Sequence, residues 1–134
     1  MHDCLFCKIL RREIPSYPVY EDADTYAFLD IRPVHLGHVL VIPKQHVATL
    51  LDADEKIAQQ WIVAVQRVAR HLSETLAIEG FNLMQNNGKI AGQVVEHLHM
   101  HIIPRHADDG LEPWPQLVHP TPQQLQALSE QIRF

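Results

Sequence analysis

Cysteines and long hydrophobic runs are both scarce in this sequence of 134 residues. Two cysteines are too few for the disulfide framework that stabilises many small secreted proteins. No apolar stretch approaches the ~20 residues that a membrane-spanning helix needs, and Met1-His2-Asp3 does not begin a signal peptide. These absences predict a cytoplasmic protein that has no membrane partner.

Basic residues are also scarce, because 11 lysines and arginines stand against 16 aspartates and glutamates. Non-specific binding to a nucleic acid backbone requires basic patches, so the composition argues against a nucleic acid partner. A nucleotide would have to be held by local dipoles and a few polar groups. The length suits one domain over residues 1–134 with a real hydrophobic core, and no repeat or linker marks a second domain.

Residues 97–103 read His-Leu-His-Met-His-Ile-Ile, an alternation of histidine with large apolar residues. A period of two is strand geometry, so the imidazoles would share one wet face of a sheet. The residues between them would enter a core from the other face, namely Leu98, Met100 and Ile102. Same-face neighbours on a strand are roughly 6.5–7 Å apart, so three in a row cannot all ligate one metal ion at about 2 Å. His97, His99 and His101 must therefore have different roles.

The rest of the chain combines short strands with helices. Asp3 is placed to cap a short helix over residues 4–12, and Asp52 with Glu55 forms a capping-box pattern ahead of a long helix. The long helix ends near Gly80. Its apolar stripe, at spacings of three and four residues, comprises Ile57, Trp61, Val65, Val68, Leu72 and Leu76. Strands are expected over residues 18–20, 25–29, 38–42, 81–85 and 94–104. Together these elements predict an α+β fold on an antiparallel sheet.

The C-terminal part is rich in proline and ends in a second amphipathic pattern. It is expected to be largely extended through its prolines, which are Pro113, Pro115, Pro120 and Pro122. Thr121 with Pro122 then opens a last helix, because proline suits the first turn. The apolar residues of this helix are Leu125, Leu128 and Ile132.

The motif at residues 97–103 resembles the signature of the histidine triad (HIT) superfamily, in which three histidines alternate with apolar residues. Other segments, in family order, are similar to the Hint-type branch and in particular to its bacterial-like zinc-bearing members; they are residues 3–9, 28–33, 37–46, 86–88 and 92–93. The resemblance covers residues 3–105 and leaves residues 106–134 as a C-terminal extension. It implies a HIT-like fold with an antiparallel sheet of about five strands, one long helix and short terminal helices.

The same resemblance implies a homodimer whose sheet extends across both protomers. The long helix also favours a dimer, because Trp61 and Ile62 lie side by side and widen its apolar face beyond what one core needs. The predicted dimer is therefore built on this helix and on the edge of the sheet.

The chemistry of imidazole suits attack on a phosphate ester or a phosphoramidate. Neutral imidazole is a competent nucleophile near pH 7 because its pKa is about 6.5, and a phosphohistidine is labile enough to hydrolyse. His99 stands at the centre of the motif, with a histidine on each side to position its target. The resemblance implies that His99 attacks the α-phosphate to form a nucleotidyl-enzyme intermediate, while His101 contacts the phosphate or the leaving group.

The predicted activity is hydrolysis of purine nucleoside phosphoramidates or related AMP and GMP conjugates. Two alternatives remain open. One is asymmetric cleavage of dinucleoside polyphosphates, as in the Fhit-like branch, and the other is a nucleotide-binding scaffold protein with residual turnover. The three intact histidines argue against a pure binding protein, which has no need of a nucleophile.

The substrate-binding residues follow from the resemblance, since each of them also suits a purely structural role. It implies that Asn86, Gly92 and Gln93 contact phosphate, although Asn-Asn-Gly is by itself a turn signal. It implies that Asp30 accepts hydrogen bonds from the ribose hydroxyls. The alternative is that Asp30 is a solvated aspartate in a turn. The purine slot aligns with apolar residues that any core would use, namely Phe6, Ile9, Phe28 and Ile31. Many Hint-type members have a hydroxyl residue where this chain has Val94, so one phosphate hydrogen bond is expected to be missing.

Cys4 and Cys7 have the C-x2-C spacing of metal ligands, but two ligands do not make a site. A thioredoxin-like redox role is disfavoured because no parallel βαβ pattern follows. His46 and His97 are available to complete a Cys2His2 set, and the resemblance implies one structural zinc ion per chain at these four residues. No role is assigned to the remaining histidines, which are His2, His35, His38, His71, His106 and His119.

Overall fold

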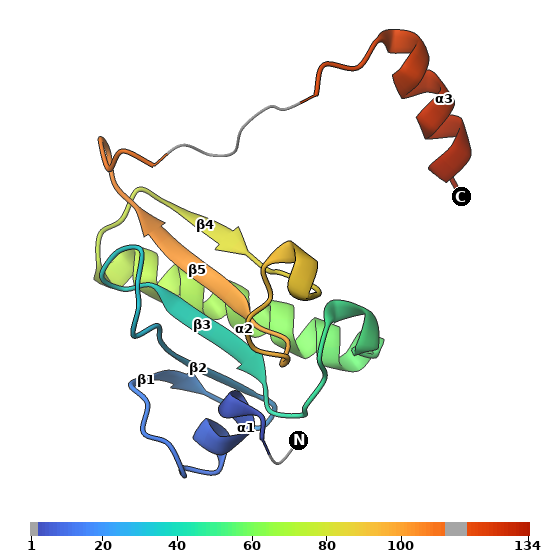
Figure 1. Cartoon of the computed structure of the whole chain (residues 1–134). Coiled ribbons are helices and arrows are strands. Elements are labelled where there is room, and N and C mark those ends of the chain that lie inside the picture. The colour runs from blue at the N-terminus through green and yellow to red at the C-terminus, as the bar shows by residue number, and fades with distance from the viewer. Residues whose placement is uncertain (1–2, 112–117) are drawn as a thin grey trace.

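Five antiparallel strands form one sheet in the order β1-β2-β3-β5-β4 (Figure 1). The computed structural model describes residues 3–111 and 118–134. The strands are β1 Pro18–Glu21, β2 Thr25–Leu29, β3 Val39–Pro43, β4 Gly80–Met84 and β5 Met100–Arg105. The helices are α1 Leu5–Leu10, α2 Glu55–Thr75 and α3 Pro122–Ile132, with 3-10 turns at Leu50–Asp52 and Lys89–Ala91. The predicted α+β fold, with five antiparallel strands and one long helix, is confirmed.

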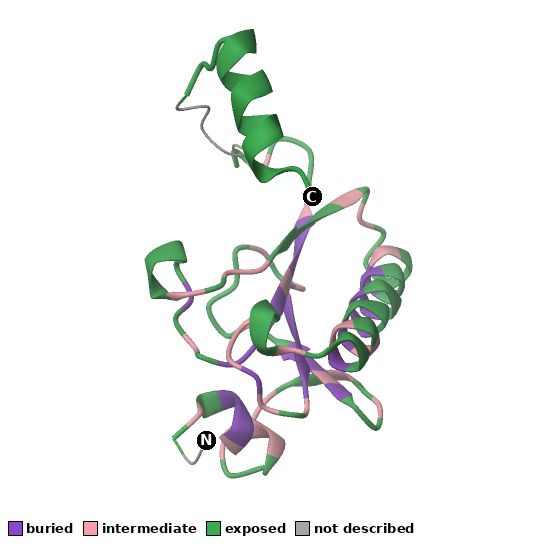
Figure 2. Ribbon diagram, turned by 90° about the vertical axis from the view of Figure 1, so that its right-hand side faces the viewer, coloured by how far each residue is buried: buried purple, intermediate pink, exposed green. Residues whose placement is uncertain are grey.

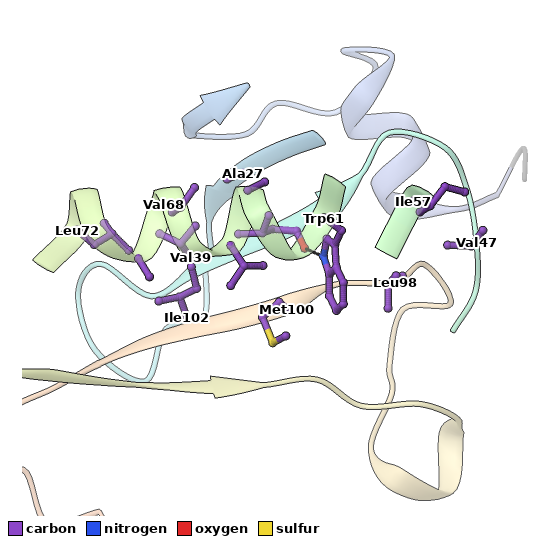
Figure 3. Close-up of a cluster of buried hydrophobic side chains, with 14 residues drawn as sticks. Ala27, Val39, Val47, Ile57, Trp61, Val68, Leu72, Leu98, Met100 and Ile102 are labelled. Atoms are coloured by element: carbon purple, nitrogen blue, oxygen red, sulfur yellow. Dashed lines mark hydrogen bonds between the residues drawn. The ribbon is translucent and has the colours of Figure 1, made fainter. Parts of the chain in front are cut away.

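Helix α2 covers one face of the sheet and supplies much of the main hydrophobic core (Figure 3). The predicted stripe is buried along the helix except at Leu76, which follows the last helical turn and is 46% exposed. The indole Nε1–H of Trp61 donates to the carbonyl of Val41 at 2.9 Å, so this side chain belongs to the chain's own core. Of the pair predicted to widen the surface, only Ile62 is exposed. No helix among the described residues is long and apolar enough to cross a membrane.

Helix α1 packs against the opposite face of the sheet, as the turned view shows (Figure 2). Alternation along the strands sends Ala27 and Val39 towards α2, whereas Phe28 and Leu40 point towards α1. The rings of His97 and His99 lie on the α1 face as well, because both contact Phe6 of that helix; the ring of His101 in turn contacts His99.

The starts and ends of helices α1 and α2 differ from the prediction. Helix α1 covers Leu5–Leu10 rather than residues 4–12. The expected capping box of Asp52 and Glu55 is wrong: Asp52 instead closes a box with Thr49 around the preceding 3-10 turn. Asp54 caps α2 by accepting the N–H of Ile57 at 2.8 Å. Cys4, not Asp3, caps α1. Helix α2 ends at Thr75 rather than near Gly80, because a left-handed residue, Ala77 with φ 52°, breaks the helical path.

The strand that carries the histidines is shorter than predicted. It was expected over residues 94–104, but β5 begins at Met100. The alternation of faces nevertheless extends upstream, because Leu98 is fully buried in the same cluster as Met100 and Ile102. The histidine face is not wet: His97 is fully buried and His99 is 6% exposed, because α1 covers them.

The C-terminal helix is confirmed and begins at the predicted residue. The hydroxyl of Thr121 accepts the N–H of Gln124, and the backbone N–H of Thr121 donates to the Gln124 side chain. The predicted extended stretch around Pro113 and Pro115 lies outside the described residues. Every residue from 118 to 134 is exposed, and Figure 1 shows α3 apart from the sheet and from α2.

Candidate active site

His99 is held in one tautomer by the backbone of the residue two positions before it. Its Nδ1 lies 2.6 Å from the carbonyl oxygen of His97, and since a carbonyl can only accept, Nδ1–H donates. The lone pair of neutral His99 is therefore on Nε2. The edge of Phe6 closes one side of the ring, with centroids 5.1 Å apart. The geometry thus gives His99 a single, oriented nucleophilic nitrogen.

A second chain of hydrogen bonds fixes the proton of His101. The backbone N–H of Val34 donates to Nδ1 of His38 at 3.0 Å, so neutral His38 carries its proton on Nε2. This Nε2–H donates to Nδ1 of His101 at 2.9 Å, and neutral His101 then carries its own proton on Nε2. Asp30 Oδ2 lies beside both rings, 3.5 Å from His38 Nε2 and 3.8 Å from His101 Nδ1. Whereas His99 presents a lone pair, His101 presents a hydrogen-bond donor.

Burial keeps these imidazoles neutral. It lowers the pKa of His38 and of His99 below the ordinary value, and the nearby charge of Asp30 opposes the effect only in part. Burial also lowers the pKa of His101 to about 4, with help from repulsion by any positive charge on His99 or His38. At neutral pH the three rings therefore remain in the tautomers that their hydrogen bonds select.

The sequence assigns no role to His38, which the structure places beside His101. Its partner His101 belongs to β5, and the two rings meet only because β3 pairs with β5. A signal was present in the sequence, since His38 stands two and four residues before Leu40 and Ile42. Both of those residues face α1, as the histidine motif does.

The four predicted metal ligands meet at one corner beside α1. Nδ1 of His97 lies 3.4 Å from Cys4 Sγ, 3.6 Å from Cys7 Sγ and 3.2 Å from His46 Nδ1. A tetrahedral zinc ion with bonds of about 2.0–2.3 Å separates its ligand atoms by about 3.3–3.8 Å. His97 Nε2–H donates to the carbonyl of Pro43 at 2.8 Å, which turns the Nδ1 lone pair towards the other three ligands. These residues form a possible metal-binding group, and two thiols with two imidazoles are a donor set that suits zinc.

Gln93 has a different environment from the one predicted for a phosphate ligand. Its side chain is buried, and its Nε2 donates to the carbonyls of Ala48 at 2.6 Å and Val95 at 3.1 Å. Its Oε1 accepts the N–H of Gly88 at 2.7 Å. These bonds occupy both ends of the amide. Gln93, which was predicted to contact phosphate, therefore braces its own loop in this structure.

Residues 86–92, which precede Gln93, are more open. The Asn86 amide lies 3.4 Å from the carbonyl of Gly92, and Gly92 adopts φ 93°, a left-handed conformation that favours glycine. Val94 is 91% exposed next to this turn. The loop is thus shaped by a glycine turn and an internal brace, with Asn86 half-buried.

Three of the four predicted purine-slot residues lie together on the α1 face. Phe6 and Phe28 contact edge to face, with centroids 5.4 Å apart, and Ile9 packs against their cluster. Tyr26, which the sequence did not single out, stacks on Phe28 at 5.6 Å. Ile31 is 78% exposed and lies outside this cluster. The structure therefore provides an aromatic wall next to His99, with Ile31 on the surface.

Comparison with known proteins agrees with this geometry. Residues 11–108 match the HIT domain family. An adenosine 5'-monophosphoramidase from Schizosaccharomyces pombe is 39% identical over 132 residues, covering 96% of this chain and 95% of that protein. An adenylylsulfatase from Arabidopsis thaliana is 40% identical over 82% of this chain and 56% of its own length. A crystal structure of a HIT family protein from Bacillus subtilis superposes with a TM-score of 0.88 at 41% identity, covering 97% of this chain and 94% of that one. The chain therefore belongs to the HIT domain family, in its Hint-type branch, and is a hydrolase of that family.

Proposed function

We propose that this protein hydrolyses purine nucleoside phosphoramidates, or related AMP and GMP conjugates, through a nucleotidyl-histidine intermediate. The observation that carries the proposal is the oriented Nε2 lone pair of His99, set by the 2.6 Å bond from Nδ1–H to the His97 carbonyl. A covalent intermediate needs a nucleophile that is neutral and aimed, and both conditions hold here. The named activities of the two enzyme relatives, on an adenosine phosphoramidate and an adenylyl sulfate, support this substrate class.

The reaction follows from the two opposite tautomers. Nε2 of His99 attacks the α-phosphorus, a P–N bond to His99 forms, and the bond from phosphorus to the leaving group breaks. The Nε2–H of His101 donates to the negative charge that develops on a phosphoryl oxygen or on the leaving group. A leaving amine takes its proton from solvent, and water then cleaves the P–N bond to release the nucleoside monophosphate and restore His99.

The remaining predicted contacts are part of the same proposal. Asp30 accepts hydrogen bonds from the ribose hydroxyls through the carboxylate oxygen that is not bound to the Arg32 N–H. The purine packs beside Phe6 and Phe28, and Asn86 contacts phosphate from its loop. Because Gln93 is committed to bracing that loop, its contribution to phosphate binding is indirect.

Trapping the intermediate is the direct test. Wild-type protein quenched in acid-free conditions after mixing with an AMP phosphoramidate should carry one AMP, and peptide mapping should place it on His99. An adduct on any other residue would refute the proposed mechanism. A panel of AMP-lysine, AMP-amine and diadenosine polyphosphates, compared by kcat/KM, separates phosphoramidase activity from the dinucleoside polyphosphate alternative.

We also propose that the Cys4, Cys7, His46 and His97 group binds one structural zinc ion. When bound, zinc would supply a closed tetrahedral cross-link and no open coordination position, so His99 and His101 remain outside its shell. Elemental analysis of protein never exposed to chelator should find one equivalent per chain. A metal content far below one equivalent would contradict this assignment.

A homodimer completes the proposal. Strand β4 is an edge strand of the sheet, and most of its side chains are exposed. Its large apolar residues Phe81, Leu83 and Met84 are each between 40% and 46% exposed. Ile62 and Val63 add exposed apolar surface on α2. A second copy that pairs with β4 would cover an otherwise open edge. Light scattering at micromolar concentration should give twice the monomer mass.

A further inference from the structure

We infer that the Cys4–Cys7–His46–His97 corner positions the catalytic histidine, so that binding of a metal ion there sets both the tautomer of His99 and the aromatic wall beside it. The inference rests on the proposed roles of His99 and of the metal group, and it adds a link between two sites that would otherwise be independent. Two separate connections carry it, one through the backbone of His97 and one through the ring of Phe6.

The first connection is a single residue that serves both sites. The side chain of His97 belongs to the corner through Nδ1, and its Nε2–H is tied to the Pro43 carbonyl. Its own carbonyl oxygen accepts the Nδ1–H of His99 at 2.6 Å. Any rotation of the His97 backbone therefore moves the acceptor that selects the His99 tautomer.

This stretch of backbone depends on such side-chain anchors because it lies outside the sheet. Strand β5 begins at Met100, and its pairing with β3 starts from the same residue. The backbone N–H of His97 bonds locally to the carbonyl of Val95, and that of Leu98 bonds to Val47. The regular strand ladder therefore does not hold His97 and His99. The buried Leu98 and its bond to Val47 hold this segment on the core side, and the metal corner is positioned to hold it on the α1 side.

The second connection is Phe6, which stands between the two cysteines of the corner. Its ring is 4% exposed and contacts His99 at 5.1 Å, His97 at 5.9 Å and Phe28 at 5.4 Å. Helix α1 has only six residues and is too short to be stable alone. Cross-linking Cys4 and Cys7 to His46 and His97 would hold this helix, and with it Phe6, against His99.

The test compares zinc-loaded protein with metal-free protein by two measurements that need no turnover. Nitrogen-15 NMR of the histidine rings reports each tautomer, and calorimetry with AMP reports the pocket. In zinc-loaded protein His99 should be protonated only on Nδ1. In metal-free protein His99 should show both tautomers, and AMP affinity should fall by roughly twofold to tenfold, the value of a lost aromatic edge contact.

His101 provides an internal control, because its tautomer is set by His38 and Val34 and has no bond to the corner. It should therefore keep its proton on Nε2 with and without metal. A metal-free protein in which His99 keeps its single tautomer and AMP binds with unchanged affinity would overturn the inference. Metal-free protein in which His99 and His101 both become mixtures of tautomers would also overturn it, since that result indicates general unfolding rather than coupling.

A variant keeps the inference testable if metal-free protein does not fold. Phe6→Leu retains all four ligands and the His97 carbonyl, so it should keep one metal ion and the His99 tautomer while AMP affinity falls by roughly twofold to tenfold. Leu5→Ala, at an exposed position on the same helix, is the matched control and should bind AMP as wild type does. Unchanged AMP affinity in Phe6→Leu would refute the second connection. Neither measurement uses the covalent intermediate, so failure of the proposed reaction would be seen separately.

Discussion

Helices α2 and α3 are both amphipathic and both capped by their own side chains, yet α2 buries seven of its residues and α3 buries none. The difference lies in what each helix meets. Strands β2, β3 and β5 present an apolar face to α2, whereas α3 lies apart from the sheet and every one of its residues is exposed (Figure 1). An apolar stripe therefore predicts a helix, but it does not determine which surface covers that helix.

Residues 105–111, which follow β5, are held by a compact group of polar contacts. The guanidinium of Arg105 forms two bonds of 2.7 Å to Asp109, one of 2.6 Å to Asn82 and one of 2.9 Å to the Leu111 carbonyl. This bidentate pairing holds the pKa of Asp109 well below its usual range. These contacts hold the segment as far as Leu111, and the proposed catalytic region and α3 are expected to respond differently to the same kind of substitution.

The largest expected effect is on activity and lies in the catalytic region. His99→Ala should abolish turnover while AMP binding is largely retained, because the nucleophile does not build the pocket. Loss of a covalent route costs many orders of magnitude, whereas His101→Ala removes one positioning hydrogen bond and should cost roughly 10²–10³ in kcat. Quenched-flow turnover and AMP calorimetry measure both effects. A His99→Ala protein with near-wild-type rate would refute the assignment.

The next effect is on stability and compares one substitution in the two helices. Leu72→Ala removes a side chain that is 6% exposed and should lower the free energy of unfolding by about 2–5 kcal/mol. Leu128→Ala removes one that is 50% exposed and should change it by less than about 0.5 kcal/mol. Urea denaturation of both variants measures the difference. A large loss in Leu128→Ala would instead show that another molecule covers α3 in solution.

A smaller effect concerns pH. The pKa of His101 falls to about 4 in the folded protein, against 6.5 for an unperturbed histidine, so only the unfolded chain binds a proton between these values. The contribution of His101 to stability is therefore complete above about pH 6.5 and is lost as the pH falls towards 4. His101→Gln should flatten the decline in unfolding free energy between pH 7 and pH 5. The same slope in both proteins would contradict the burial argument, and removal of α3 should leave the slope unchanged.

The smallest effect compares the two helix caps. Asp54→Ala removes the acceptor for the Ile57 N–H and should destabilise the protein by about 1 kcal/mol, because α2 belongs to the core. Thr121→Ala removes the corresponding cap of α3 and should reduce helix content by circular dichroism without changing the melting temperature. A lower melting temperature in Thr121→Ala would indicate that α3 contributes to the folded core.

The wrongly predicted starts of α2 and β5 have a common cause. The pattern of Asp52 and Glu55 fits a capping box, but Thr49 and Asp52 form an equally good one three residues earlier, and local pattern alone cannot rank them. The alternation at residues 97–103 set the side-chain faces correctly, yet the strand begins only at Met100 because the pairing with β3 starts there. Faces depend on backbone geometry, whereas strand limits depend on a partner elsewhere in the chain.

The elements that could be predicted from the sequence are those that rest on local chemistry. The α2 stripe, the cap of α3 at Thr121 and the opposite faces of residues 98–102 all follow from periodicity and hydrogen bonding within a few residues. The tautomer of His101, the bond between Gln93 and Ala48 and the exposure of α3 depend instead on contacts between distant parts of the chain. The proton on His101 and the bonds of Gln93 are set by groups that the fold brings within about 3 Å, and two of those groups, His38 and Ala48, lie far away in the chain.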